Sequence, residues 1–390
     1  MVDPFQFSRL PLICFGAGKI DLLPGFIKKY GTGIILVTDE KSFISSSSAG
    51  KLFDTFLKHA INYNHVIVRG EPSPETIDTA VNTLKDENID VVVAIGGGSV
   101  LDAGKAISAM MYMTETVQEY LEGTGTREHP GTKIPFIALP TTSGTGSEAT
   151  KNAVISQIGK NGFKKSLRHD NFVPDIAIVD PELTLSCPAD ITASSGMDSF
   201  TQLTESYLSD KAGKYTDALA LEGLKAIRSS LVRSYLDGND IMARTGMSFA
   251  ALTSGICLAN AGLGVVHGFA SSIGGLFTIP HGIICGTLMA PANAVIVREL
   301  RRHRSNPEAL GKYAELGRLF IEQKGNSDDY YIDGFISYLQ ELTYEMELPR
   351  LGQFGIEEKG IEDICRLTEI KNNPVKLSQE ELEEIIRERL

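Results

Sequence analysis

The sequence of 390 residues predicts an α/β domain followed by an all-helical domain. Up to about residue 185, short runs of β-branched residues alternate with helix-period stretches. This alternation is typical of a parallel sheet that helices cover on both faces. After residue 186 helix-period patterns dominate and strand patterns nearly vanish. We therefore divide the chain into an α/β domain, residues 1–185, and a helical domain, residues 186–390, and expect a ligand cleft between them.

The elements that this division predicts can be followed along the chain. Buried strands are expected at 33–39, 65–70, 89–99, 133–142 and 174–182, with an intervening helix at 74–88. Helices are expected in the second part at 214–236, 307–324 and 377–390. Ser378 and Glu381 have the spacing of a capping box, which marks the start of the last helix.

Residues 245–297 contain no Asp, Glu, Lys or Arg, so a membrane span is the obvious alternative there. The segment is interrupted by Gly, Ser, Thr, Asn and His, and by Pro280, without a clean apolar block of about 20 residues. This composition favours buried helices at the centre of a soluble domain.

Charge and cysteine content exclude several classes of protein. The net charge of −12 and the lack of a long basic run argue against a general nucleic-acid-binding protein. The cysteines are odd in number and form no CxxC pair, which favours buried free thiols in a reducing compartment. They are Cys14, Cys187, Cys257, Cys285 and Cys365. Because the N-terminal residues do not have the pattern of a signal peptide, we expect a cytoplasmic protein without a membrane segment.

A glycine-rich loop follows the strand expected at 89–99. Gly97 and Gly98 would let the backbone approach a phosphate, and the following helix would direct free N–H groups at it. This arrangement predicts a pyrophosphate site. The alternative is a tight strand-to-helix turn in which Ser99 and Asp102 cap the helix without any ligand.

A second loop, ALPTTSGTGSEAT at 138–150, is dense in hydroxyl groups and bare backbone, which favours ligand binding over a simple connection. The alternative is a polar loop with a cap formed by Thr145 and Glu148. Asp39 ends the strand at 33–39. An acid at a strand tip can bind both ribose hydroxyls of an adenosine and repel a 2′-phosphate, which favours NAD over NADP. The alternative for Asp39 is a turn residue.

Four motifs together resemble the iron-containing (group III) alcohol dehydrogenase family: GGGSVLDAGK, PTTSGTGSEAT, DPELTLSCPADITASSGMDS and the later VHG and PHG pair. The resemblance extends nearly from end to end. It implies a dehydroquinate synthase-like fold, in which an N-terminal dinucleotide-binding α/β domain precedes a helical domain that carries a divalent metal. It also implies cofactor contacts at Asp39, Gly97, Gly98, Ser99, Asp102, Thr141, Thr142, Thr145, Ser147, Lys165 and Leu183.

The resemblance further implies an iron or zinc ion held by one aspartate and three histidines. Asp198, His267 and His281 match three of these positions. Gln202 stands where the family has the remaining histidine, one helical turn after Asp198. Ser271 stands where the family has a histidine that is thought to transfer a proton near the nicotinamide.

Gln202 leaves three alternatives open. Its amide oxygen could be a ligand, although it is a weaker donor than imidazole for zinc or iron. Asp198, His267 and His281 could instead form a three-ligand site with open positions, as catalytic zinc often has. Otherwise the affinity is too low to hold a metal. For Asp198 itself, a helix cap formed with Ser195 is the alternative.

The leading functional hypothesis is an NAD(P)-dependent oxidoreductase that interconverts a small alcohol and its aldehyde or ketone. A divalent metal in the interdomain cleft would polarise the substrate oxygen, and the nicotinamide would accept the hydride. Ser271, a water chain or a ribose hydroxyl would relay the proton. Alternatives are a metal-independent reductase of an activated carbonyl, similar to maleylacetate reductase, and a redox-inactive nucleotide-binding protein. A homodimer or a larger homo-oligomer is usual in families like this.

Overall fold

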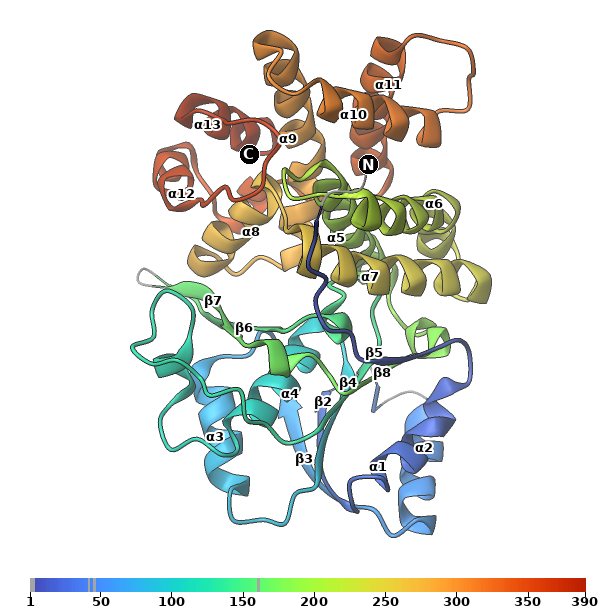
Figure 1. Ribbon diagram of the computed structural model, residues 1–390, viewed down its shortest axis with the longest axis vertical. Helices are drawn as coiled ribbons and strands as arrows, with labels where there is room; N and C mark the ends of the chain where they lie inside the picture. The colour runs from blue at the N-terminus through green and yellow to red at the C-terminus, as the bar shows by residue number, and fades with distance from the viewer. Residues whose placement is uncertain (1–3, 41–42, 45–46, 160–161) are drawn as a thin grey trace.

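The computed structural model describes residues 4–40, 43–44, 47–159 and 162–390 (Figure 1). Its first part contains a six-stranded sheet in the order β1-β8-β5-β4-β2-β3, and every neighbouring pair is parallel. The strands are β1 (Leu12–Phe15), β2 (Gly33–Asp39), β3 (Asn62–Val68), β4 (Val91–Gly96), β5 (Phe136–Pro140) and β8 (Ile176–Val179). The five expected strands are all present, and β1 is an additional short edge strand.

Helices cover both faces of this sheet. Helices α1 (Leu23–Ile27) and α2 (Ser47–Lys58) share one apolar cluster with it, and α3 (Pro74–Leu84) and α4 (Gly98–Met110) share another. Residues 91–96 of the central strand are all buried because both faces are covered. The predicted α/β class is therefore confirmed.

The antiparallel hairpin of β6 (Asn152–Gln157) and β7 (Phe163–Arg168) was not predicted. Its second strand is polar and only partly buried, so it lacks the continuous apolar run that marks the sheet strands. The hairpin lies between the sheet and the helical part in Figure 1, and β7 packs against α8 (Val265–Leu276).

Among the described residues after 186, helices are the only regular secondary structure, as expected. The longer ones are α5 (Ala189–Leu208), α6 (Lys214–Leu236), α7 (Ile241–Ala261), α9 (His281–His303), α10 (Pro307–Phe320) and α11 (Asp328–Glu345). The last two are α12 (Ile361–Leu367) and α13 (Gln379–Glu388), and Ser378 and Glu381 form the predicted capping box. One large apolar cluster joins these helices, and we keep 185/186 as the proposed domain boundary.

Helices α7, α8 and α9 account for most of the uncharged segment at 245–297. Two of them, α7 and α9, are long and apolar enough to cross a membrane. Their apolar windows are 67% and 83% buried inside the protein, which is what core helices require. The burial agrees with the expected packing at the centre of a domain.

The strand order brings the predicted cofactor loops to one edge of the sheet. Parallel strands end at the same edge, so Asp39 at the end of β2, Gly97 after β4 and Thr141 after β5 lie along it. The chain turns outward from β2 to β3 and then returns to β4 on the other side of β2. Such a reversal leaves a crevice at the carboxyl ends of the strands, where nucleotides bind in related topologies.

Three caps that the sequence offers as alternatives to ligand binding differ from the structure. Helix α4 begins at Gly98 with Gly97 as its N-cap, so Ser99 is already inside it. Gly146, and not Thr145, precedes the short 3₁₀ turn Ser147–Ala149. Ser195 lies well inside α5 and donates a hydrogen bond to Ile191 O. Capping therefore does not explain Ser99 or Ser195, whereas Thr145 Oγ1 accepts a hydrogen bond of 3.3 Å from Ser147 N in the turn.

A buried lysine joins the two loops. Lys105 on α4 is 1% exposed, and its Nζ lies 2.9 Å from Ser147 O and 2.6 Å from Asn152 O. Asp102, one turn earlier, accepts a hydrogen bond of 2.5 Å from Ser147 Oγ. Burial lowers the pKa of Lys105 to about 8 and raises that of the neighbouring Glu148 to about 7. The conformation of the hydroxyl loop thus depends on α4.

Glu148→Gln should change how folding stability depends on pH. Between the ordinary pKa of 4.5 and about 7, the unfolded chain loses a proton that folded Glu148 retains. Wild-type stability should therefore fall as pH rises through this window, by a contribution on the order of 3 kcal/mol. Denaturant unfolding gives the free energy of unfolding of both proteins at about pH 5 and pH 8. The difference, variant minus wild type, should be larger at the higher pH by this amount. Exposed Glu87→Gln is the control, and an unchanged wild-type pH slope in Glu148→Gln would contradict the assignment.

Candidate metal centre and cofactor site

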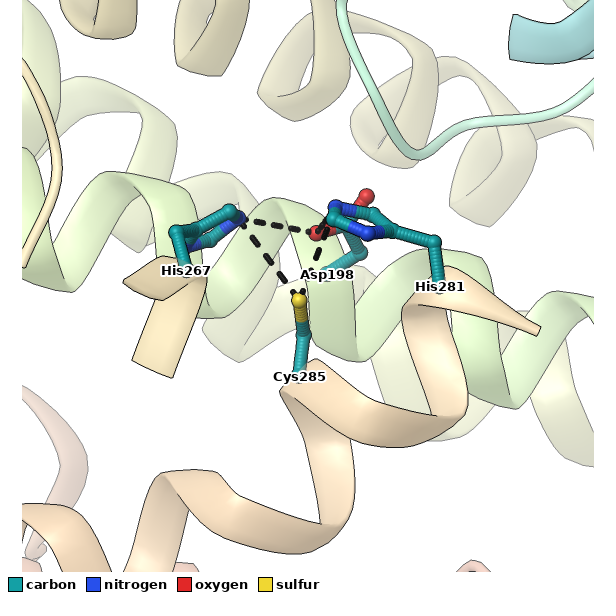
Figure 2. Close-up of side chains that lie close together, drawn as sticks. All are labelled: Asp198, His267, His281 and Cys285. Carbon is teal, nitrogen blue, oxygen red and sulfur yellow. Dashed lines mark hydrogen bonds and ion pairs between the residues drawn. The ribbon is translucent and has the colours of Figure 1, made fainter. Parts of the chain in front are cut away.

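Four side chains from three helices converge in the helical part (Figure 2). They are Asp198 on α5, His267 on α8, and His281 and Cys285 on α9, and their potential ligand atoms all lie within 4.8 Å of one another. Asp198 Oδ1 lies 3.3 Å from His267 Nε2 and 3.7 Å from His281 Nε2. The structure thus brings together Asp198, His267 and His281, three of the four residues that the sequence offers as metal ligands, the fourth being Gln202.

Local structure explains why these atoms meet. Pro280 caps α9, so His281 is its first residue, and Cys285 follows one turn later on the same face. Cys285 Sγ lies 3.6 Å from His267 Nε2 and 3.7 Å from His281 Nε2. Cys285 is fully buried and was predicted only as a free thiol. Its spacing from His281, one helical turn, is the sequence signal that could have identified it.

The four side chains of this centre are all ionisable, and they lie close together inside the protein. Asp198 is 1% exposed. Burial opposes its ionisation, but the two histidines lower its pKa to about 2. Burial also opposes charge on His267, although its partners, including Asp198 and Glu205, raise its pKa well above the ordinary value. Burial lowers the pKa of His281 to about 4 and raises that of Cys285 to about 12. The site therefore holds an anionic Asp198 that requires a cation beside it.

Glu205 fixes the orientation of His267. This carboxylate, two turns after Asp198 on α5, accepts hydrogen bonds of 2.7 Å from Val266 N and from His267 Nδ1. The His267 Nε2 atom is consequently the one that faces Asp198. A carboxylate behind a ligating histidine sets its tautomer and raises its basicity. Sequence reasoning did not identify Glu205, although its spacing from Asp198 places both on one helical face.

The two positions that depart from the family pattern have different surroundings. Gln202 is 2% exposed, and its amide oxygen accepts a hydrogen bond of 3.0 Å from Ser254 Oγ on α7. Ser271 is exposed and donates to His267 O at 3.1 Å. Together with Lys165 and His267, Ser271 lines a cavity of about 740 Å³ between the β6–β7 hairpin and the helices.

The glycine and hydroxyl loops are in direct contact. A Cβ added to Gly98 would lie 2.7 Å from the Thr145 side chain, and one added to Gly97 would lie 3.4 Å from Thr142 Oγ1. Within the described chain, the buried Thr141 hydroxyl oxygen finds no hydrogen-bond partner. Close glycine backbone and an unpartnered buried hydroxyl together fit a bound phosphate-containing cofactor.

The other predicted cofactor residues are spread around this edge. Asp39 is the last residue of β2, and Ser99 is in the first turn of α4. Asp102 and Ser147 bond to each other. Leu183 is 6% exposed and packs in the core beneath α1 and α2. Lys165, on β7, instead lies at the cavity with Ser271.

The hydroxyl loop rests directly on the helix that carries Asp198. Ser199 Oγ donates to Ser143 O at 3.1 Å and to Gly144 O at 2.8 Å. On its other side the loop touches α7 so closely that a Cβ on Gly255 would lie 2.2 Å from Gly146 O. The loop at 141–147 is therefore attached to α5, the helix that carries Asp198 of the candidate metal cluster.

Comparisons with known proteins agree with this arrangement. The family model for iron-containing alcohol dehydrogenase matches residues 11–181, and that for the C-terminal part of the Fe-containing family matches residues 192–390. Alcohol dehydrogenase 4 of Saccharomyces cerevisiae (strain YJM789) is 29% identical over 97% of this chain and 96% of its own. Long-chain-alcohol dehydrogenase 1 of Geobacillus thermodenitrificans is 31% identical over 91% of this chain and 88% of its own.

A solved structure gives the same result. Sulfoacetaldehyde reductase from Bifidobacterium kashiwanohense, in complex with NAD+, superimposes with a TM-score of 0.85 at 26% identity, covering 99% of each chain. The fold, the converging ligand cluster and the two family models point to one conclusion. The chain belongs to the iron-containing alcohol dehydrogenase family and is an alcohol dehydrogenase-like enzyme.

Proposed function

We propose that this enzyme is an NAD-dependent oxidoreductase that interconverts a small alcohol and its aldehyde or ketone with the help of a divalent metal. The convergence of Asp198, His267 and His281 carries the proposal, because a buried anion and two imidazoles suit zinc or iron. When bound there, a divalent metal would supply Lewis-acid polarisation of the substrate oxygen. Glu205 would hold His267 in the ligating tautomer.

The cofactor would lie along the carboxyl edge of the sheet. Gly97, Gly98 and the N-terminus of α4 would receive the pyrophosphate, and the Thr141 hydroxyl would gain the partner that it lacks. Asp39 would bind the adenosine ribose, which makes NAD the preferred coenzyme. The NAD+ complex of the sulfoacetaldehyde reductase supports this choice. We keep the remaining predicted residues as proposed cofactor contacts: Ser99, Asp102, Thr142, Thr145, Ser147, Lys165 and Leu183.

Substrate and proton would use the cavity beside the metal centre. His267 and Ser271 both line it, so a small alcohol or aldehyde there could reach the centre. Ser271 faces the cavity, and in a relay its oxygen would accept the substrate proton while its own hydroxyl proton, which is directed at His267 O, passes to water in the cavity. We assign to Ser271, with water or a ribose hydroxyl, the relay that a histidine provides elsewhere in the family.

NADH oxidation with a panel of short aldehydes tests the proposed function. Activity should appear with Zn²⁺, Fe²⁺ or Mn²⁺, disappear on chelation and return on metal addition. Asp198→Asn should lower kcat/KM by more than about 100-fold, since loss of an outer partner alone typically costs 10–100-fold. The exposed Asp190→Asn on the same helix should leave it unchanged. Full activity in chelator would instead indicate a metal-independent reductase, and NAD binding without turnover would indicate a redox-inactive relative.

Asp39→Asn should shift the coenzyme preference. Removing the carboxylate removes its repulsion of a 2′-phosphate, so the ratio of kcat/KM for NADPH to that for NADH should rise by about tenfold or more. Steady-state kinetics with both coenzymes measure this ratio. Asp86→Asn, which makes the same charge change at an exposed site after α3, is the control. An unchanged ratio would remove Asp39 from the cofactor site.

Glu205→Gln should weaken metal binding while leaving every proposed ligand in place. An amide cannot accept both existing hydrogen bonds with the strength of a carboxylate, so metal affinity should fall about 10–100-fold. Competition with a chromophoric chelator measures the Kd for Zn²⁺. Glu222→Gln, at an exposed ion pair with Lys225, is the matched control. Equal affinities for all three proteins would show that Glu205 has no effect on the centre.

A further inference from the structure

We propose that Cys285 is the fourth protein ligand of this centre, and that the resulting Asp–His–His–Cys set selects zinc. The proposal rests on the metal-assisted function argued above, in which the substrate oxygen would join the four protein ligands as a fifth ligand. It assigns a ligand role to a residue that the family pattern does not predict, and it removes that role from Gln202.

Four of the six distances between the potential ligand atoms are close to those of a tetrahedral centre. With metal–nitrogen and metal–oxygen lengths of about 2.0 Å and a metal–sulfur length of about 2.3 Å, tetrahedral ligand atoms lie about 3.3 Å (N to O) and about 3.5 Å (S to N) apart. The Oδ1 of Asp198 lies 3.3 and 3.7 Å from the two histidine Nε2 atoms. The sulfur of Cys285 lies 3.6 and 3.7 Å from the same two atoms. Figure 2 shows all four groups directed at one another.

Gln202 has a polar contact outside the centre. Its amide oxygen, the atom that would bind a metal, lies 3.0 Å from Ser254 Oγ on α7, which also lies 2.8 Å from Ala251 O. The Ser254 hydroxyl also contacts the backbone of the hydroxyl loop, at Gly144 O. Gln202 thus connects α5 to α7 and to this loop. Among the residues that the structure describes, the hydrogen bonds of Cys285 are with the two histidines of the centre, so no contact outside the centre competes for its sulfur.

The donor set determines the metal. A soft thiolate with two imidazoles and one carboxylate suits Zn²⁺ much better than Mg²⁺ or Mn²⁺, and Zn²⁺ exceeds Fe²⁺ in general affinity order. Binding converts the Cys285 thiol to a thiolate and releases its proton to solvent. One thiolate and one carboxylate then neutralise a divalent ion, whereas one aspartate and three neutral histidines leave one positive charge. A metal with its ligands that has no net charge is less costly to bury in this apolar helical core than one with a positive charge.

X-ray absorption of the unmodified protein tests the ligand set directly. Protein loaded with one equivalent of Zn²⁺ should show a sulfur neighbour at about 2.3 Å beside nitrogen and oxygen neighbours at about 2.0–2.1 Å. The Co²⁺-loaded protein should show a thiolate-to-cobalt charge-transfer band in the near ultraviolet. Only nitrogen and oxygen neighbours around bound zinc, with no charge-transfer band, would overturn the role of Cys285 and leave the proposed function standing.

Variants separate the ligand role from a structural role. Cys285→Ala should lose the cobalt band and bind Zn²⁺ at least about 100-fold more weakly, beyond the usual effect of an outer partner. Cys257→Ala is the matched control: it removes a buried cysteine on α7 whose thiol contacts Thr216 O. It should retain both properties. Gln202→Ala should also retain the bound metal and the band.

The spectra of the unmodified protein cover the case in which Cys285→Ala fails to fold, and a double variant tests the exchange of one ligand for another. Gln202→His with Cys285→Ala supplies the histidine that the family has at 202, so metal content should recover without the charge-transfer band. Metal content from elemental analysis, with zinc exceeding iron when both are supplied equally, completes the test. Equal Zn²⁺ affinity in wild type and Cys285→Ala would refute the inference. A wild-type protein that binds no metal would refute both this inference and the metal-assisted function.

Discussion

The buried carboxylate of Asp198 is the constraint on which the rest of the site depends. An ionised group at 1% exposure in the middle of α5 is stable only with a cation beside it. Histidines from two other helices converge on it, and Glu205 holds one of them from behind. Without a metal, a proton on His267 provides the positive charge. A divalent ion would take over this role, so the helical core packs around a position that always requires a cation.

The cofactor edge has the same dependence on buried charge. Lys105 holds the hydroxyl loop through backbone and side-chain oxygens, and Asp102 ties the same loop to α4. Several residues that look like cofactor contacts in sequence are therefore also the supports of the loop. A polar residue in a glycine-rich motif can serve the ligand indirectly by fixing the backbone that receives it.

The sequence predicts most of the fold because its signals are local. Helix α6 covers 214–236 as expected, and the buried sheet strands are continuous β-branched runs. The β6–β7 hairpin escaped prediction because β7 is polar on a half-exposed surface. Asp198, His267 and His281 were identified through the family resemblance. Helical spacing places Glu205 beside Asp198 and Cys285 beside His281, but their contacts with His267 depend on how α5, α8 and α9 pack, which the sequence does not give.

The hydrogen bonds from Ser199 to the backbone at Ser143 and Gly144 have a mechanical consequence. They attach a loop that leaves the sheet to a helix of the second half, one residue from Asp198. A hinge motion that opened the cavity could move the hairpin or the outer helices. It could not separate this loop from Asp198 without breaking both bonds and the close contact at Gly255. The distance between this loop, which we propose contacts the cofactor, and Asp198 is therefore fixed. Any motion that opens the cavity must occur in other parts of the chain.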